Sequence, residues 1–274
     1  MNTTKLTFQS ADDDASFTPQ EKSRLLTETD IKDLTFKFLY WDIASVGSTA
    51  RDLLFYAKAH YGAKYELLTL AFEDFASGKT PTAFSCVPML KVVGPNNKEV
   101  DIAENVVIDM YLAERFNLMG DNKWESITIQ AFYSNIQYLR ERTFTTVMGV
   151  PEEKRLKSRQ DFFQGTLKKF LENHAFHLQA NGNNGHYIGN KLSLADIHLN
   201  NVIHYFWTVP WGRTVVEDHF KKCEPVWKVY ETVQNDPVLA AWRKTDEFKA
   251  YETSSIKWYS TLGVPGEEPQ HQID

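Results

Sequence analysis

Apolar side chains in the first half of the chain follow alternating strand and helix patterns. The run FKFLYW (36–41) is apolar except for Lys37 and predicts a short buried strand. ARDLLFYAKAHYG (50–62) then carries leucine and alanine at helical spacing and ends in Gly62, a typical C-terminal cap. Three more strands and a closing helix are predicted in KYELLTLAF (64–72), VPMLKVV (87–93), KEVDI (98–102) and AENVVIDMYLAERF (103–116). This order predicts a small mixed sheet covered by helices, with a loop over 74–86.

From Trp124 onward the periodicity is helical throughout. The apolar stripes predict helices in 124–144, 152–176, 193–207, 225–235 and 237–252. Residues 1–35 are different, because Asp, Thr, Ser and Gln dominate and few large apolar side chains occur. We therefore expect a flexible or loosely draped arm over 1–35, an α/β domain over 36–118, an all-helical domain over 122–262 and a tail over 263–274.

Composition narrows the class of protein. The 274 residues carry a formal charge of -6 and are 42% hydrophobic, enough for a substantial core in one or two domains. No stretch approaches the roughly 20 apolar residues of a membrane span, and the N-terminus lacks the apolar core of a secretion signal. Scattered Lys and Arg make nucleic acid a poor candidate partner. With only Cys86 and Cys223, a disulfide framework is not expected, and we expect a cytoplasmic protein.

Three places along the predicted sheet could hold a ligand. Tyr40 stands where the first strand ends, which predicts an exposed phenol beside a loop. Val87-Pro88 opens a strand; a cis bond there would turn the Val87 backbone outward, although spacing alone favours an ordinary trans proline. Glu104-Asn105 opens a helix directly after a strand, which suits a carboxylate or is a plain cap. Together these features could hold a small extended peptide beside Tyr40.

At these residues the chain resembles the cytosolic glutathione transferases of the tyrosine type, over about residues 36 to 260. Tyr40 lies eleven residues before Arg51, as in those enzymes, and SCVPML resembles their strand with a cis proline. GNKLSLADIHL resembles the capping box of their helical domain, in which Ser193 and Asp196 cap each other. The resemblance implies a thioredoxin-like first domain, an all-helical second domain and a homodimer.

The same resemblance implies a site for glutathione without a metal ion. Tyr40 would be the catalytic residue, and the glutathione contacts would be Phe75, Lys79, Val87, Pro88, Glu104 and Asn105. Such an enzyme conjugates glutathione to small hydrophobic electrophiles, as in detoxification. Some positions depart from the family pattern, namely Val46, Phe75, Asn105 and Gln130, so a binding or structural protein without catalysis is the alternative function.

Activation of the thiol is the chemical task that the resemblance assigns to Tyr40. A free thiol has a pKa of about 8.5, and a hydrogen bond from the phenol would favour the thiolate; a shift of two units corresponds to roughly 2.7 kcal/mol. Ser45 and Ser48 compete for this role, because serine-type members carry their hydroxyl in the same loop. Ser48 is equally explained as the N-cap of a helix that begins at Ala50.

Overall fold

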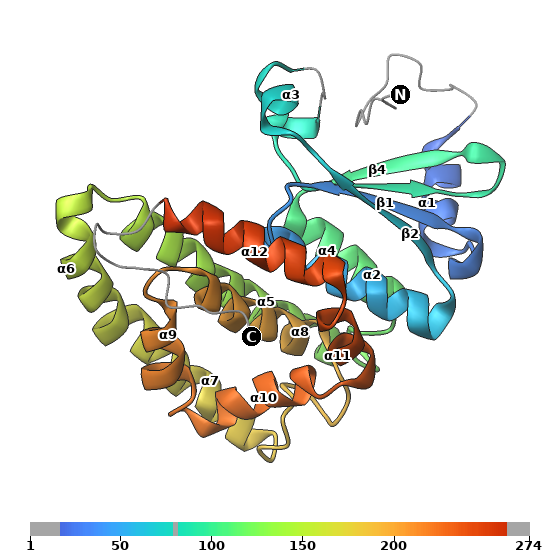
Figure 1. The fold of residues 1–274 in the computed structure, drawn as a ribbon. Coiled ribbons are helices and arrows are strands. Elements are labelled where there is room, and N and C mark those ends of the chain that lie inside the picture. The colour runs from blue at the N-terminus through green and yellow to red at the C-terminus, as the bar shows by residue number, and fades with distance from the viewer. Residues whose placement is uncertain (1–16, 79–81, 262–274) are drawn as a thin grey trace. The chain divides into compact units, whose positions relative to one another are not determined.

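The computed structural model describes residues 17–78 and 82–261 and divides the chain into two compact units (Figure 1). One unit is Met1–Phe116 and the other is Asn117–Asp274. The division falls close to the predicted boundary between residues 118 and 122. Each unit is described by itself below.

The first unit is built on a four-stranded mixed sheet in the order β2-β1-β3-β4. The central strand β1 (Thr35–Tyr40) runs parallel to β2 (Lys64–Thr69) and antiparallel to β3 (Met89–Val93), and β3 pairs with β4 (Glu99–Ala103). The register sets Tyr40 opposite Thr69 and Leu39 opposite Met89. The predicted mixed sheet is therefore confirmed.

Alternation along β1 separates two faces of this sheet. The rings of Phe36, Phe38 and Tyr40 share one face, where Phe36 meets Phe116 edge to face at 5.8 Å. Helices α2 (Ser48–Tyr61) and α4 (Asn105–Arg115) cover that face in Figure 1. On the other face Leu39 belongs to a small apolar cluster with Leu70, Met89 and Ala103.

An N-terminal helix was missed by the sequence prediction. Residues Pro19–Thr27 form α1, which begins with a capping box in which Thr18 and Glu21 satisfy each other's backbone N–H groups. Its buried Leu25 packs on Gly94, and α4 holds its end, because Arg115 donates to the carbonyl oxygens of Thr27 and Thr29 at 2.7 and 2.5 Å. The expectation of a loosely draped arm is thus wrong from Thr18 to the end of α1. The capping box and the hydrogen bonds from α4 provide the stability that the few apolar residues of this segment do not.

Two further local predictions need correction. A short helix, α3 (Phe72–Ala76), stands where the end of a strand and a loop were predicted. Helix α2 begins at Ser48 rather than Ala50, and its N-cap is Gly47, with no side-chain capping hydrogen bond. The predicted C-cap is confirmed, since Gly62 has a left-handed φ of 67°. Short 3₁₀ turns occupy Ile31–Asp33, Ser45–Gly47, Ala83–Ser85 and Pro95–Asn97.

The second unit contains helices and turns but no strand in its described part, as predicted. Its longest helix is α5 (Lys123–Thr143), and the others are α6 (Glu152–Phe162), α7 (Lys168–Ala180), α8 (Leu194–Thr208), α9 (Gly212–Val215), α10 (Glu224–Gln234), α11 (Pro237–Arg243) and α12 (Asp246–Ser260). One-turn π-helical segments occur at Phe144–Met148, Phe163–Leu167 and Val216–Phe220. Over residues 17–78 and 82–261, no helix is long and apolar enough to cross a membrane.

Helix α8 forms the centre of the second unit, and nearly all its side chains are buried. The predicted capping box is confirmed: Ser193 accepts from the backbone N–H of Asp196, and the Asp196 carboxylate accepts from the N–H of Ser193 at 2.8 Å. The same carboxylate also accepts from the N–H of Tyr187 at 2.8 Å. One buried carboxylate therefore fixes both the start of α8 and the loop before it.

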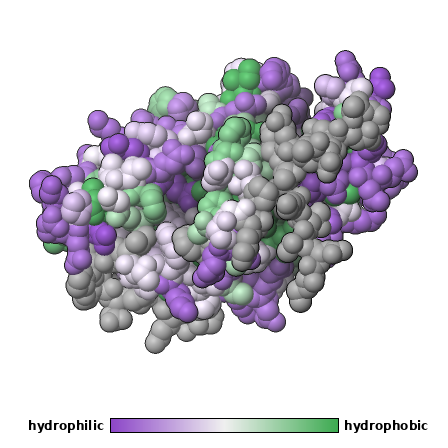
Figure 2. All heavy atoms as spheres, turned by 90° about the horizontal axis from the view of Figure 1, so that it is seen from above, coloured by the Kyte–Doolittle hydropathy of each residue, from purple (hydrophilic) through white to green (hydrophobic). Residues whose placement is uncertain are grey.

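Several large apolar side chains remain exposed in the described chain. Phe84 is 75% exposed, Trp124 69% and Phe176 68%. The face shown in Figure 2 is mainly hydrophilic, and smaller hydrophobic patches interrupt it. Grouped apolar side chains at a surface mark places where ligands or partners bind.

Candidate functional site

Tyr40 ends β1 with its ring under the following loop. Only 4% of the residue is exposed, and the Arg51 guanidinium lies 5.5 Å from the ring centroid. Gly47 approaches from the loop so closely that a Cβ there would lie 2.5 Å from the Tyr40 Cδ1. The expectation of an exposed phenol is therefore wrong, because a glycine lets the loop fold over the ring.

Arg51 holds the loop that covers Tyr40. Its side chain extends from α2 and is itself buried, with 4% exposed. Its Nη1 donates to the carbonyl oxygen of Ile43 at 2.6 Å, and its Nη2 donates to that of Trp41 at 2.7 Å. Charged donors make strong hydrogen bonds to carbonyl groups when they are buried. The helical arginine eleven residues after Tyr40 thus fixes the chain between them, a role that spacing alone did not disclose.

Ser45 and Ser48, the alternative hydroxyl donors, lie in this same loop. Ser45 has a positive φ of 46°, which a residue with a Cβ adopts only rarely, and it opens the turn Ser45–Gly47. Ser48 is the first residue of α2 and not its N-cap, so that explanation of Ser48 is wrong. Both residues are half-buried.

Val87 and Phe75 come together on the sheet face opposite the Tyr40 ring. The Val87-Pro88 bond is cis, as the family resemblance implied and against what spacing alone favoured. Val87 precedes Met89, the first paired residue of β3, so its backbone stands outside the sheet ladder. Phe75 packs on the same apolar cluster and meets Trp41 edge to face, with ring centroids 5.1 Å apart.

Glu104 and Asn105 mark the start of α4, as predicted. Glu104 has a φ of 72° and makes no capping hydrogen bond, so it is not a plain cap. Its carboxylate instead accepts from the Cys86 thiol at 3.3 Å, a contact that the sequence analysis missed. Burial, and then the bond to Glu104, raises the pKa of the Cys86 thiol.

Asn105 presents an amide at the N-terminus of α4. Its Nδ2 atom is buried and has no hydrogen-bond partner among the described residues. An unpaired buried donor is costly, and the N-terminus of a helix attracts negative charge. The position therefore suits an anionic or carbonyl group of a ligand.

The sequence analysis also named Lys79, Gln130 and a site without a metal ion. Lys79 lies outside the described residues. Gln130 lies on α5, where its amide nitrogen faces the Ser126 hydroxyl at 3.3 Å. In the described part of the chain, no group of three or more His, Cys, Asp or Glu side chains could hold a metal ion. Around β1, β3 and α4 the first unit presents hydroxyl, amide, thiol, carboxylate and backbone groups.

Comparison with known proteins finds similarity to glutathione S-transferases, both with a family profile and with individual sequences. A family profile described as "Glutathione S-transferase, C-terminal domain" matches residues 137–246. The probable glutathione S-transferase 6 of Caenorhabditis elegans is 25% identical over 212 residues, which cover 74% of this chain and 97% of that protein. Glutathione S-transferase 1 of Ascaris suum is 26% identical over 217 residues, covering 76% and 94%.

Solved structures share the fold of the chain. The sigma class GST of Fasciola hepatica superimposes with a TM-score of 0.66 at 22% identity, covering 77% of this chain and 96% of that one. The prostaglandin synthase D of Nilaparvata lugens gives a TM-score of 0.65 at 23% identity, with 77% and 98% covered. The likeness extends over both units described above.

Proposed function

Because the chain belongs to the cytosolic glutathione transferase family and is a transferase of that kind, we propose that it joins the glutathione thiolate to small hydrophobic electrophiles. Glutathione is then its co-substrate, and no metal ion takes part. The proposed site for the tripeptide is the end of the first unit formed by β1, β3 and the start of α4.

The observation that carries this proposal is the unpartnered amide of Asn105. Its buried Nδ2 atom stands at the N-terminus of α4, next to the Glu104 carboxylate. A γ-glutamyl group carries both a carboxylate and an ammonium group. The Asn105 amide and the helix N–H groups would bind the carboxylate, and Glu104 would bind the ammonium. Both charges of that end of the tripeptide would then have a partner.

The remaining contacts follow from the surroundings of Val87. Its backbone groups stand outside the sheet ladder, so they could pair with the cysteinyl part of an extended peptide, as in added-strand recognition. Phe75 would pack beside the peptide, and Pro88 would shape the start of β3. A role of Lys79 at the glycine carboxylate stays a prediction.

We assign activation of the thiol to Tyr40. Its phenol is a donor at neutral pH, and a hydrogen bond to the sulfur would favour the thiolate. The Arg51 guanidinium lies 5.5 Å from the centroid of the Tyr40 ring, and its positive charge would favour the thiolate further. Because only 4% of Tyr40 is exposed, the sulfur would have to approach the hydroxyl beside the loop 41–47.

Substitution of the three candidate hydroxyls tests this assignment. Tyr40→Phe keeps the buried ring and removes the hydroxyl, and we expect the conjugation rate with a generic aromatic electrophile to fall at least tenfold. The pKa of bound glutathione, read from thiolate absorbance against pH, should rise by about two units. Ser45→Ala and Ser48→Ala are the matched controls. Full activity in Tyr40→Phe together with loss in one serine variant would transfer the role to that serine.

The buried phenol also favours a second candidate function. A protein in which Tyr40 cannot reach the sulfur would bind glutathione without activating it, as a binding or structural member of the family. Retention on immobilised glutathione separates the two functions when it is combined with turnover measurements. Retention without turnover supports the second function, and no retention at all contradicts both.

We further propose that the chain forms a homodimer and acts in the cytoplasm. Exposed apolar side chains in each unit, among them Phe84 and Trp124, support an interface with a second copy. Both cysteines are free thiols, which fits a reducing compartment. Sedimentation at micromolar concentration tests the dimer, and a monomer at that concentration would contradict it.

A further inference from the structure

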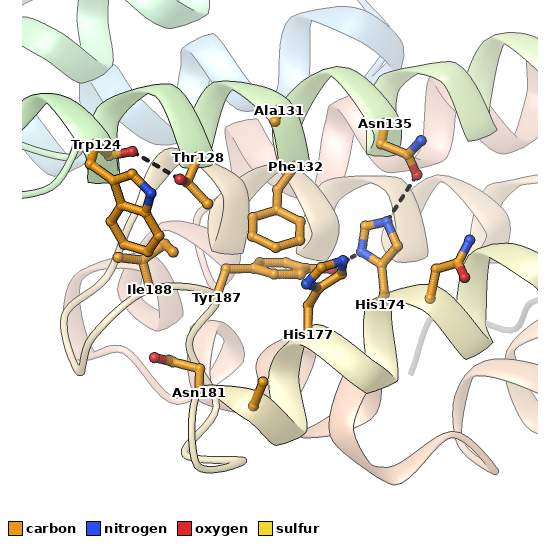
Figure 3. Close-up of a pocket in the computed structure, with 12 residues that line it drawn as sticks. Trp124, Thr128, Ala131, Phe132, Asn135, His174, His177, Asn181, Tyr187 and Ile188 are labelled. Atoms are coloured by element: carbon orange, nitrogen blue, oxygen red, sulfur yellow. Dashed lines mark hydrogen bonds between the residues drawn. The ribbon is translucent and has the colours of Figure 1, made fainter.

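Three aromatic side chains meet where α10 packs against the end of α8, within the second unit (Figure 1). They are Trp207 of α8 and Trp227 and Tyr230 of α10, and we call them the aromatic cluster. None of them belongs to the proposed glutathione site. None lines the cavity of about 570 Å³ between α5, α7 and the loop before α8, which Figure 3 shows. The aromatic cluster is therefore a separate feature of the helical unit.

Direct contacts hold the three rings together. Trp227 stacks on Tyr230, with ring centroids 4.5 Å apart and an interplanar angle of 26°. The indole N–H of Trp207 donates a hydrogen bond to the Tyr230 hydroxyl. The indole N–H of Trp227 donates to the Glu231 carboxylate at 2.8 Å. All three aromatic residues are half-buried, so the fold fixes their rings and still leaves them partly exposed to solvent.

A positive charge already lies over two of these rings. The Nζ atom of Lys221 is 5.7 Å from the ring centroid of Trp207 and 5.4 Å from that of Trp227. The same Nζ atom pairs with the Glu217 carboxylate at 2.7 Å. The faces of indole rings and nearby carboxylates both attract cations. The aromatic cluster is therefore a site for positive charge, and the chain itself supplies the occupant.

Lys221 is an occupant that another cation can displace. It directly follows the π-helical segment Val216–Phe220, and its side chain is 38% exposed. Both ring distances are close to the limit of about 6 Å at which such rings attract a cation. A primary ammonium is also strongly hydrated, so water and Glu217 can satisfy it away from the rings. A cation with three methyl groups on its nitrogen is wider and donates no hydrogen bond, so it would fill the space between the two indoles better.

We propose that the aromatic cluster binds small molecules that carry a trimethylammonium group, which takes the place of the Lys221 ammonium between Trp207 and Trp227. Aromatic faces are a common recognition surface for quaternary ammonium groups. The carboxylates of Glu217 and Glu231 add negative charge beside the rings. Lys221 turns into solvent when the ligand binds. This inference does not depend on the proposed conjugation of glutathione, because the two sites share no residue.

Two probes of the same shape test whether the charge is recognised. Choline carries a trimethylammonium group, and 3,3-dimethylbutan-1-ol has a carbon atom in place of its nitrogen. Labelling with 5-fluorotryptophan gives one ¹⁹F signal for each of the seven tryptophans, and Trp207→Phe and Trp227→Phe identify the two that matter. We expect choline to shift these two signals in a saturable way and the alcohol to bind at least fivefold more weakly. No saturable shift with choline, or equal affinity for both probes, would overturn the proposal.

Substitutions locate the cation within the protein. Trp227→Leu removes one ring and keeps an apolar side chain, so it should weaken choline binding at least tenfold, read from the Trp207 signal. Lys221→Ala removes the competing ammonium from an exposed position and should strengthen binding at least fivefold. Lys222→Ala is the matched control, because Lys222 pairs with Asp218 at 3.0 Å in the same i,i+4 geometry, and it should leave the affinity unchanged. Full binding by Trp227→Leu, or no gain in Lys221→Ala, would overturn the proposal.

Competition separates this site from other sites and other partners. Saturating S-hexylglutathione should leave the choline-induced shifts unchanged, whereas their loss would assign choline to the glutathione site and overturn the proposal. A peptide that contains trimethyllysine should bind no more tightly than choline does. Binding of that peptide at least tenfold tighter than choline would make the aromatic cluster a site for a protein partner, and that result also overturns the proposal.

Discussion

Two buried histidines should make the helical unit unstable in mild acid. Burial is the main cause that lowers the pKa of His174 and of His198 from 6.5 to about 3, aided by His177 and Arg140 respectively. In the unfolded chain both side chains titrate near 6.5. Below that pH the unfolded chain binds protons that the folded chain does not, so stability is complete above pH 6.5 and is lost as the pH falls toward 3.

The size of the effect follows from the distance to pH 6.5. At pH 5 each histidine costs about 2 kcal/mol, from roughly 1.36 kcal/mol per pH unit over about 1.5 units. Together His174 and His198 remove about 4 kcal/mol from the free energy of unfolding. A domain of this kind is stable by only about 5–15 kcal/mol. Acid at pH 5 should therefore weaken the helical unit severely without unfolding every molecule.

Urea unfolding at pH 7.5 and at pH 5, followed by tryptophan fluorescence, measures this loss. Every tryptophan except Trp41 lies in the second unit, so the signal reports mainly on it. His174→Gln should lower stability at pH 7.5, because Tyr187 and Asn135 lose the imidazole between them. The further loss between pH 7.5 and pH 5 should then fall by about 2 kcal/mol relative to the wild type.

A matched control uses the neighbouring histidine of the same helix. His177 is exposed, so His177→Gln should change the loss between the two pH values by less than about 0.5 kcal/mol. The reasoning is refuted if the wild type loses less than about 1 kcal/mol between pH 7.5 and pH 5. It is equally refuted if His174→Gln loses as much as the wild type does.

Four substitutions in the first unit give further predictions. Gly47→Ala should cost about 1–3 kcal/mol and lower conjugation at least tenfold, because the added Cβ meets the Tyr40 ring at 2.5 Å; Gly62→Ala, strained at a φ of 67° with open space around it, should cost about 1 kcal/mol and leave activity unchanged. Asn105→Ala should raise the KM for glutathione at least tenfold in steady-state assays, and an unchanged KM would remove Asn105 from the site. Arg51→Met should lower the urea midpoint, by about 3 kcal/mol in stability, because the carbonyl groups of the loop lose a charged donor; a stable variant would contradict that role.

The sequence predicted the architecture because local patterns agreed with the fold. Short apolar runs and helical apolar periodicity predicted the mixed sheet and the helical unit, and two helix ends, the Gly62 C-cap and the Ser193–Asp196 capping box, were recognised from residue type. Helix α1 was missed because its stability comes from α4, which lies far away in sequence. Apolar content alone does not reveal such a contact.

At the candidate site, the sequence predicted where an element begins better than it predicted the surroundings of the side chains. The start of α4 at Asn105 was predicted from residue order. The burial of Tyr40, the hold of Arg51 on the loop and the Cys86–Glu104 contact were not, because each depends on a close approach between segments. Gly47 could have signalled the first of these, since a glycine in such a loop permits another group to approach the backbone.

The packing of α1 on the sheet determines where this protein can be truncated or fused to another chain. β4 is the outermost strand on its side of the sheet, and α1 packs against both β4 and α4. A truncated chain that begins at Thr35 would lack α1. Gly94 would then lose its contact with Leu25, and the exposed edge of β4 could pair with other chains. Fusion junctions therefore belong ahead of Phe17, where the capping box and everything after it stay intact.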